Sequence, residues 1–209
     1  ILQPSQRISP KKASRENVRK ALENAHKTFH FTGHGFYDSF RPQESAIALS
    51  DGLLTVRDIN KLNLSSYRLV CLAACETALT GKDGITTEYV GLVSAFLAAG
   101  ATNVVSTLWP VKEISSAWFM INFYQRLLAG ESPALALKNT QNWLKNITWQ
   151  QLANWIEQLG QLPDLREGVD RLEARAANTL KEGSTIGLDQ LTEYSDPYHW
   201  AAYTLTGQD

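Results

Sequence analysis

The sequence predicts an α/β fold, in which a mostly parallel sheet is covered by helices on both faces. Three apolar runs have the length of buried strands, at about 28–35, 67–74 and 102–108. Apolar residues recur at helical spacing after the second and third runs, over 85–99 and 114–130. Parallel strands need a long crossover connection, which is usually a helix. The alternation of strands with helices is therefore typical of an α/β sheet.

Shorter signals complete the predicted elements. A first helix, capped by Ser14, is expected over 14–26, because serine at an N-cap accepts a hydrogen bond from the first helical turn. The apolar run 46–49 precedes Asp51-Gly52, which is a strong hairpin signal. Residues typical of helix starts precede two further predicted helices: Thr55 and Ser132, the latter followed by Pro133.

The segment 149–194 differs in character from the rest of the chain. Apolar residues at helical spacing from Leu165 to Leu180 alternate with charged ones, which predicts an amphipathic helix with a solvated face. Two interpretations remain open: the helix packs on its own sheet, or the segment adds a contact with a partner. We expect one domain over 1–209, with 149–194 as a helical insertion before the last strand.

Composition restricts the classes of partner. Twenty Lys and Arg against 21 Asp and Glu give a net charge of −1, and no basic run could neutralise a row of phosphates, so nucleic acid is not expected. No apolar stretch reaches the roughly 20 residues of a membrane helix. Two cysteines without a disulfide fit a reducing cytoplasm. Because Met120 is the one methionine, we expect a fragment of a longer polypeptide.

Two of the predicted strands end on reactive side chains. His34 follows the first strand and Cys75 follows the second, 41 positions later. Neighbouring parallel strands would bring these ends together, and ligands of open α/β sheets bind at the carboxyl ends of strands. An imidazole that accepts the thiol proton produces a thiolate nucleophile and retains an acid for the leaving amine. The pattern predicts a cysteine-protease dyad without a cofactor.

Simpler interpretations apply to the other cysteine and histidines. Cys71 lies within the strand, roughly 13 Å from Cys75 at about 3.3 Å per residue, so a disulfide is excluded. The same spacing argues against a zinc site formed by His30, His34 and both cysteines, because four-residue spacing brings ligands together on a helix and separates them along a strand. We therefore expect no metal, and a core or supporting role for His30. His26 and His199 are expected to be structural.

Four motifs stand in order along the chain. They are Thr-Gly-His-Gly at 32–35, Ala-Ala-Cys-Glu-Thr at 73–77, the run 100–111 that ends in Leu-Trp-Pro-Val, and Asp-Pro-Tyr-His-Trp-Ala-Ala-Tyr at 196–203. Together they resemble one family, the CHAT domain. The similarity extends from about residue 29 to 207. It implies a caspase-like three-layer fold and kinship with separase and the caspases. It also implies an upstream repeat or regulatory domain in the full-length chain.

The resemblance also implies roles for individual residues. His34 would be the general acid and base, and Cys75 the nucleophile. The backbone N–H groups of Gly35 and Cys75 would form the oxyanion hole. An acidic residue near the position of Glu113 receives substrate arginine in separase-like relatives. Lys112 departs from the acidic pair common in the family and could neutralise Glu113.

Charge points to the same substrate preference. The candidate pocket residues Glu113, Asp83 and Glu88 are all acidic, so we expect cleavage of protein substrates after Arg, tolerance of Lys and rejection of Asp. Trp109 is expected either to wall the pocket or to belong to the core. The rival to a cysteine endopeptidase is a catalytically silent scaffold or interaction module of the same shape. A weaker rival is a cysteine-dependent acyltransferase.

Overall fold

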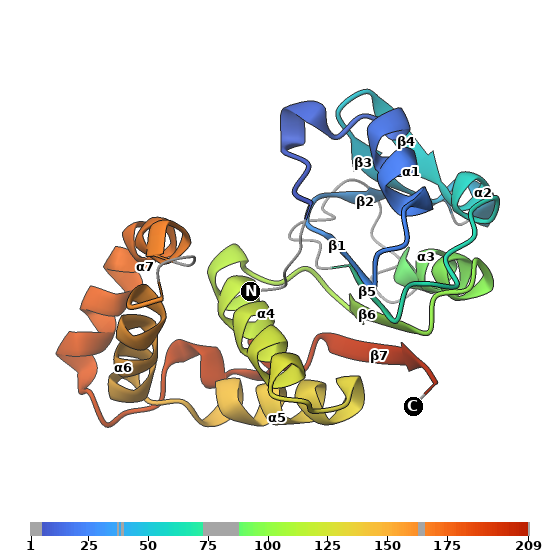
Figure 1. The fold of residues 1–209 in the computed structure, drawn as a ribbon. Coiled ribbons are helices and arrows are strands. Elements are labelled where there is room, and N and C mark those ends of the chain that lie inside the picture. The colour runs from blue at the N-terminus through green and yellow to red at the C-terminus, as the bar shows by residue number, and fades with distance from the viewer. Residues whose placement is uncertain (1–5, 37, 39, 73–87, 163–165, 209) are drawn as a thin grey trace. The chain divides into compact units, whose positions relative to one another are not determined.

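The chain forms two compact units. The computed structural model describes residues 6–36, 38, 40–72, 88–162 and 166–208 (Figure 1). One unit, here called the sheet unit, comprises Pro4–Val111 and Ala202–Asp209. The described part of the other, here called the helical unit, is Lys112–Ala201. Each unit is described by itself below.

The main sheet of the sheet unit has the strand order β1-β5-β6-β7. Its strands are β1 (Thr28–Phe31), β5 (Leu69–Leu72), β6 (Asn103–Thr107) and β7 (Tyr203–Gly207). The first three are mutually parallel, and β7 runs antiparallel to β6. Every residue of β5 and β6 is buried, as expected for strands of a parallel sheet whose two faces are both covered.

A second, antiparallel sheet lies in the same unit. It has the order β2-β3-β4, with β2 (Gly35–Phe36), β3 (Ala46–Leu49) and β4 (Gly52–Thr55). The predicted turn joins β3 to β4, and Gly52 has a φ of +143°, which favours glycine at this position. Because β2 follows directly on the segment after β1, the two sheets share the connection that carries His34.

Three helices complete the sheet unit: α1 (Arg15–Glu23), α2 (Val56–Ile59) and α3 (Glu88–Ala98). Short 3-10 turns occupy Pro10–Lys12 and Pro42–Glu44. Ser14 caps α1 by accepting from the Asn17 N–H at 3.3 Å, and Thr55 and Asp58 form a capping box on α2. Buried side chains of all three helices pack with Val70, Leu72 and Val104 of the main sheet in one hydrophobic cluster.

The helical unit contains α4 (Glu113–Leu128), α5 (Pro133–Asn146), α6 (Trp149–Gly160), α7 (Arg166–Ile186) and α8 (Pro197–Trp200). A 3-10 turn, η3 (Glu193–Ser195), precedes α8. Ser132 caps α5, and Thr148 forms a capping box with Gln151 on α6. These caps accept hydrogen bonds from N–H groups that have no partner within the helix.

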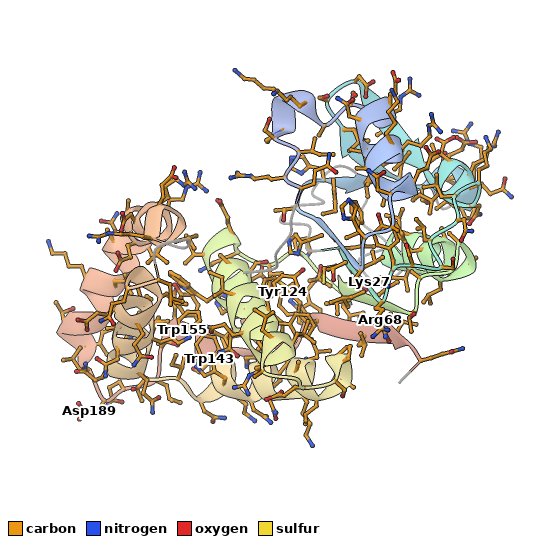
Figure 2. All side chains as sticks on the ribbon, viewed as in Figure 1. Lys27, Arg68, Tyr124, Trp143, Trp155 and Asp189 are labelled. Carbon is orange, nitrogen blue, oxygen red and sulfur yellow. The ribbon has the colours of Figure 1, made fainter. Side chains whose placement is uncertain are left out.

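Aromatic side chains fill the helical unit. The rings of Trp143 and Trp155 lie 4.8 Å apart between centroids, and Trp155 meets the buried Trp118 edge-on (Figure 2). The Trp155 indole N–H donates to Gln125 Oε1 at 3.1 Å, which satisfies the polar atom of this ring. Helix α5, helix α6 and helix α4 each supply one of the three tryptophans, so the rings join the helices.

The close approach of α6 and α7 depends on a glycine. A Cβ atom at Gly183 would lie 2.2 Å from the Trp149 ring, so only glycine fits against this ring without displacement. Gly168, earlier in the same helix, has no neighbouring atom within 4 Å of such a Cβ. The two glycines of α7 therefore have different structural consequences.

A polar network joins α4 to α5. The side-chain oxygen of Asn122 accepts from Arg126 Nε at 2.8 Å and from the buried Thr140 hydroxyl at 3.2 Å. Arg126 also pairs with Glu131 at 3.2 Å. Buried polar groups of this kind are stable because each has a partner.

The α/β class and the mostly parallel sheet predicted from the sequence are confirmed. The expected helices at 14–26, 85–99 and 114–130 correspond to α1, α3 and α4, and the segment 149–194 is mainly helical. The expected single domain and the caspase-like three-layer arrangement stay predictions. Within the described residues, no helix is long and apolar enough to cross a membrane.

Candidate active site

The carboxyl ends of β1 and β5 lie side by side, as predicted. The two strands pair in parallel, with Thr28 opposite Leu69 and Phe31 opposite Leu72. Lys27 and Arg68 stand at the opposite, amino-terminal ends, where the Arg68 N–H donates to the Lys27 carbonyl (Figure 2). The segments that leave β1 and β5 therefore start from the same edge of the sheet.

His34 lies in the short connection between β1 and β2. Its side chain is exposed, and its carbonyl oxygen accepts the Ala48 N–H of β3 at 2.8 Å. This bond attaches the connection to the antiparallel sheet. The predicted position of His34, beyond the carboxyl end of the first strand, is confirmed, while Cys75 and Asp83 lie outside the described residues.

The same hydrogen bond determines the direction of the Gly35 N–H. A trans peptide points its C=O and its N–H in opposite directions. Because the His34 carbonyl points to β3, the Gly35 N–H of the same peptide points away from β3. Strand β2 is at the edge of its sheet, so this N–H faces no strand of that sheet.

Gly33 passes close to an aromatic ring, and its φ is not in the left-handed region. A Cβ atom here would lie 2.7 Å from the Phe31 ring, so a larger residue would require this ring to move. The glycine thus lets the chain pass close to Phe31 on its way to His34.

Cys71 and His30 face each other across β5 and β1 but differ in burial, because Cys71 is buried and His30 is exposed. Cys71 is fully buried in β5, which confirms its assignment to the core. His30 is opposite Cys71 in the strand register, and its Nε2 lies 2.9 Å from Thr32 Oγ1. In the part of the chain that the structure describes, no three His, Cys, Asp or Glu side chains are grouped to hold a metal ion.

Trp109 follows β6, the third parallel strand. It lies two positions beyond Thr107, at the same edge of the sheet as the connection of His34, and it is half-buried. This intermediate burial is compatible with either predicted role, a pocket wall or part of the core. Glu88 is the first residue of α3, after the undescribed segment 73–87.

Glu113 is the first residue of α4, in the helical unit. Its carboxylate forms an ion pair with Arg175 of α7. The sequence-based expectation named Lys112 as the neutralising cation, and this is wrong: Lys112 is the N-cap residue of α4 and forms no ion pair among the described residues. No local pattern identifies Arg175, which is 62 positions away in a face expected to be solvated.

His199 supports the start of α4. It is buried, and its Nδ1 lies 2.9 Å from the hydroxyl oxygen of Ser115. The Ser115 hydroxyl donates to the Lys112 carbonyl at 3.0 Å, so the imidazole N–H donates to the serine. Burial, followed by the nearby positive charge of Lys112, lowers the pKa of His199. The neutral imidazole therefore holds the first turn of α4, which begins at Glu113.

The fold and the strand-end histidine define a class, an α/β protein with a candidate site at the carboxyl edge of a parallel sheet. Comparison with known families narrows it: the CHAT domain matches residues 2–208, and the chain belongs to this caspase-related family. The resemblance seen in the four motifs is thereby confirmed.

Two curated proteins are similar over part of the chain. Tetratricopeptide repeat protein 28 of Mus musculus is 40% identical over 92 residues, which is 43% of this chain and 4% of the mouse protein. The protein of the same name from Homo sapiens is 37% identical over 91 residues, with the same shares. The matched region thus spans about 4% of the length of these relatives.

Proposed function

We propose that the chain is a cysteine endopeptidase that cleaves protein substrates through Cys75 and His34. His34 accepts the thiol proton, and the thiolate attacks the carbonyl carbon of the scissile bond. The C–N bond breaks as His34 transfers its proton to the leaving amine, which leaves an acyl group on Cys75. Water, deprotonated by His34, then hydrolyses this thioester and restores the thiol.

The orientation of the His34–Gly35 peptide carries this proposal. The Ala48 N–H holds the His34 carbonyl against β3, and the Gly35 N–H points away from β3 beside the carboxyl end of β1. An N–H fixed in this way suits the developing negative charge of a tetrahedral intermediate, together with the Cys75 N–H. Membership in a caspase-related family supports the same reaction class.

We further propose an acidic specificity pocket that contains Glu113, with Asp83, Glu88 and Trp109 as its other candidates. A carboxylate accepts paired hydrogen bonds from a planar guanidinium, so substrates with Arg before the scissile bond are preferred. Lys offers the same charge without this planar geometry and is tolerated. Asp is rejected by like charge.

The context of the domain is also a proposal. The relatives are named for tetratricopeptide repeats, and the aligned region is a small part of each. We expect the chain to act beside a repeat or regulatory region of a longer, cytoplasmic polypeptide.

Alkylation kinetics and cleavage products together test the proposal. Iodoacetamide should modify Cys75 faster than the buried Cys71, and His34→Ala should slow the modification of Cys75, since the thiolate is the reactive form. Incubation with a peptide library, followed by mass spectrometry, should give fragments that end in Arg or Lys. Equal reactivity of both cysteines, with no cleavage, would favour the silent scaffold. Transfer of the acyl group to an added amine in place of water would indicate the acyltransferase.

A further inference from the structure

The carboxylate proposed to receive substrate arginine already holds an arginine of the chain. Glu113 begins α4, and Arg175 lies near the middle of α7, on a helix separated by 62 positions in sequence. Their side chains form an ion pair, and each is about 60% exposed. Both residues belong to the helical unit, where α4 and α7 contact each other (Figure 1).

The neighbouring arginine shows that this contact is specific. Arg171 lies one helical turn before Arg175 and pairs with Glu167 of its own helix at 2.5 Å. Its charge is therefore satisfied within α7. Arg175 instead reaches to another helix, to the single carboxylate of the first turn of α4.

The pair is favourable but weak. The positive end of the α4 dipole stabilises a carboxylate at the first helical position, which favours Glu113 as a receptor for a cation. Water screens the attraction to Arg175, because both side chains are largely exposed. Exposed ion pairs of this kind change an equilibrium by about 1.4- to 5-fold. A second guanidinium that arrives with its own binding contacts can displace Arg175.

We propose that Arg175 is an internal competitor for the basic side chain of a substrate. Without substrate its guanidinium occupies Glu113, and a substrate Arg or Lys must displace it before binding. This inference rests on the proposed function, in which Glu113 receives the basic side chain. A competitor weakens the binding of every cationic residue by the same factor and leaves neutral residues unaffected. Arg175 therefore sets the preference for basic over neutral substrates, and leaves the preference for Arg over Lys unchanged.

Three peptides and two variants test this inference in the full chain. The peptides differ only in the residue before the scissile bond, which is arginine, lysine or the neutral isostere citrulline. Arg175→Gln should lower KM for the arginine and lysine peptides by about two- to fivefold, with kcat and the citrulline peptide unchanged. Arg171→Gln is the matched control, because it removes the same charge one turn away and leaves the Glu113 pair intact.

The outcomes separate the inference from the function on which it rests. If the arginine peptide is cleaved and Arg175→Gln leaves its KM unchanged, the inference is overturned and the peptidase proposal stands. A lower melting temperature of Arg175→Gln with unchanged KM would show that the pair only joins α4 to α7. Equal KM changes in Arg175→Gln and Arg171→Gln would show that the effect comes from net charge alone, which overturns the inference. If the chain neither cleaves nor binds the arginine peptide, the proposed function fails and the inference fails with it.

Discussion

The sheet unit and the helical unit use different kinds of contact. In the sheet unit, backbone pairing aligns β1 with β5 and directs the peptide after His34. In the helical unit, side chains join residues that are far apart in sequence, as in the Trp149–Gly183 and Glu113–Arg175 contacts. The comparison teaches that backbone pairing positions the connection that carries His34, while side-chain contacts hold the candidate substrate receptor.

The largest expected effect breaks this comparison at the sheet unit. Cys75→Ala should reduce turnover by at least about 10³-fold, because the nucleophile is lost, and His34→Ala should reduce it by about 10² to 10⁴-fold. Peptide cleavage with purified variants measures both.

Cys71→Ala is the matched control, because Cys71 lies in β5, four positions before Cys75. It should retain turnover and lose about 1 kcal/mol of unfolding free energy, since a buried sulfur is removed. Equal loss of activity in folded Cys71→Ala and Cys75→Ala would contradict the assignment of the nucleophile.

The next largest effect is expected on the stability of the helical unit. Gly183→Ala should lower the free energy of unfolding by about 1–2 kcal/mol. The new methyl group collides with Trp149, and this steric cost exceeds the gain in helix propensity from Gly to Ala. Gly168→Ala, in open space on the same helix, should raise the free energy of unfolding by about 0.5–1 kcal/mol. Urea titration measures both variants, and a rise in stability of Gly183→Ala as well as Gly168→Ala would show that the α6–α7 contact is not tight.

A smaller effect sharpens the comparison, because the described residues of each unit include a capping box on a threonine. Thr55→Ala in α2 and Thr148→Ala in α6 should each cost about 1 kcal/mol, since each removes an acceptor for a helical N–H. Hydrogen exchange should show the loss in the first turn of the altered helix. Protection lost across the other helices of the same unit would reveal that the cap also supports their packing.

The smallest effect is a pH dependence that arises in the helical unit. The pKa of His199 is lowered from 6.5 by burial first and by Lys112 second, so the unfolded chain binds the proton more tightly than the folded one. The contribution of His199 to stability is complete above about pH 6.5 and decreases as the pH falls below it. Urea titrations of wild type and His199→Gln from pH 5 to 8 should converge toward low pH. Parallel curves would contradict the assignment.

The sequence predicts the strands and the position of His34 better than it predicts the contacts between helices. Strands β5 and β6 are continuous apolar runs, and the hairpin at Gly52 has a local turn signal, so both could be found without a structure. The position of His34 after β1 follows from the same pattern. The short strand β2 could not be predicted, because two residues have no periodicity and pair only through β3.

The partner of Glu113 could not be found from the sequence either. Arg171 has an acid four positions earlier in its own helix, Glu167, whereas Arg175 has none there. That local difference does not point to Glu113, because the partner of Arg175 depends on how α7 packs against α4. Gly33 shows the same limit, since its closeness to the Phe31 ring can be seen only in the structure.

The hydrogen bond from the Ala48 N–H to the His34 carbonyl determines when the Gly35 amide acquires its orientation. Strand β3 supplies no candidate catalytic side chain, yet its hairpin with β4 directs the Gly35 amide. The orientation of this amide is therefore achieved when the hairpin folds, before any substrate arrives. In the proposed reaction, reorganisation of the amide would then add nothing to the activation barrier, because folding of the hairpin has already oriented it. Loosening the hairpin at a distance would slow the reaction without altering any group that touches the substrate.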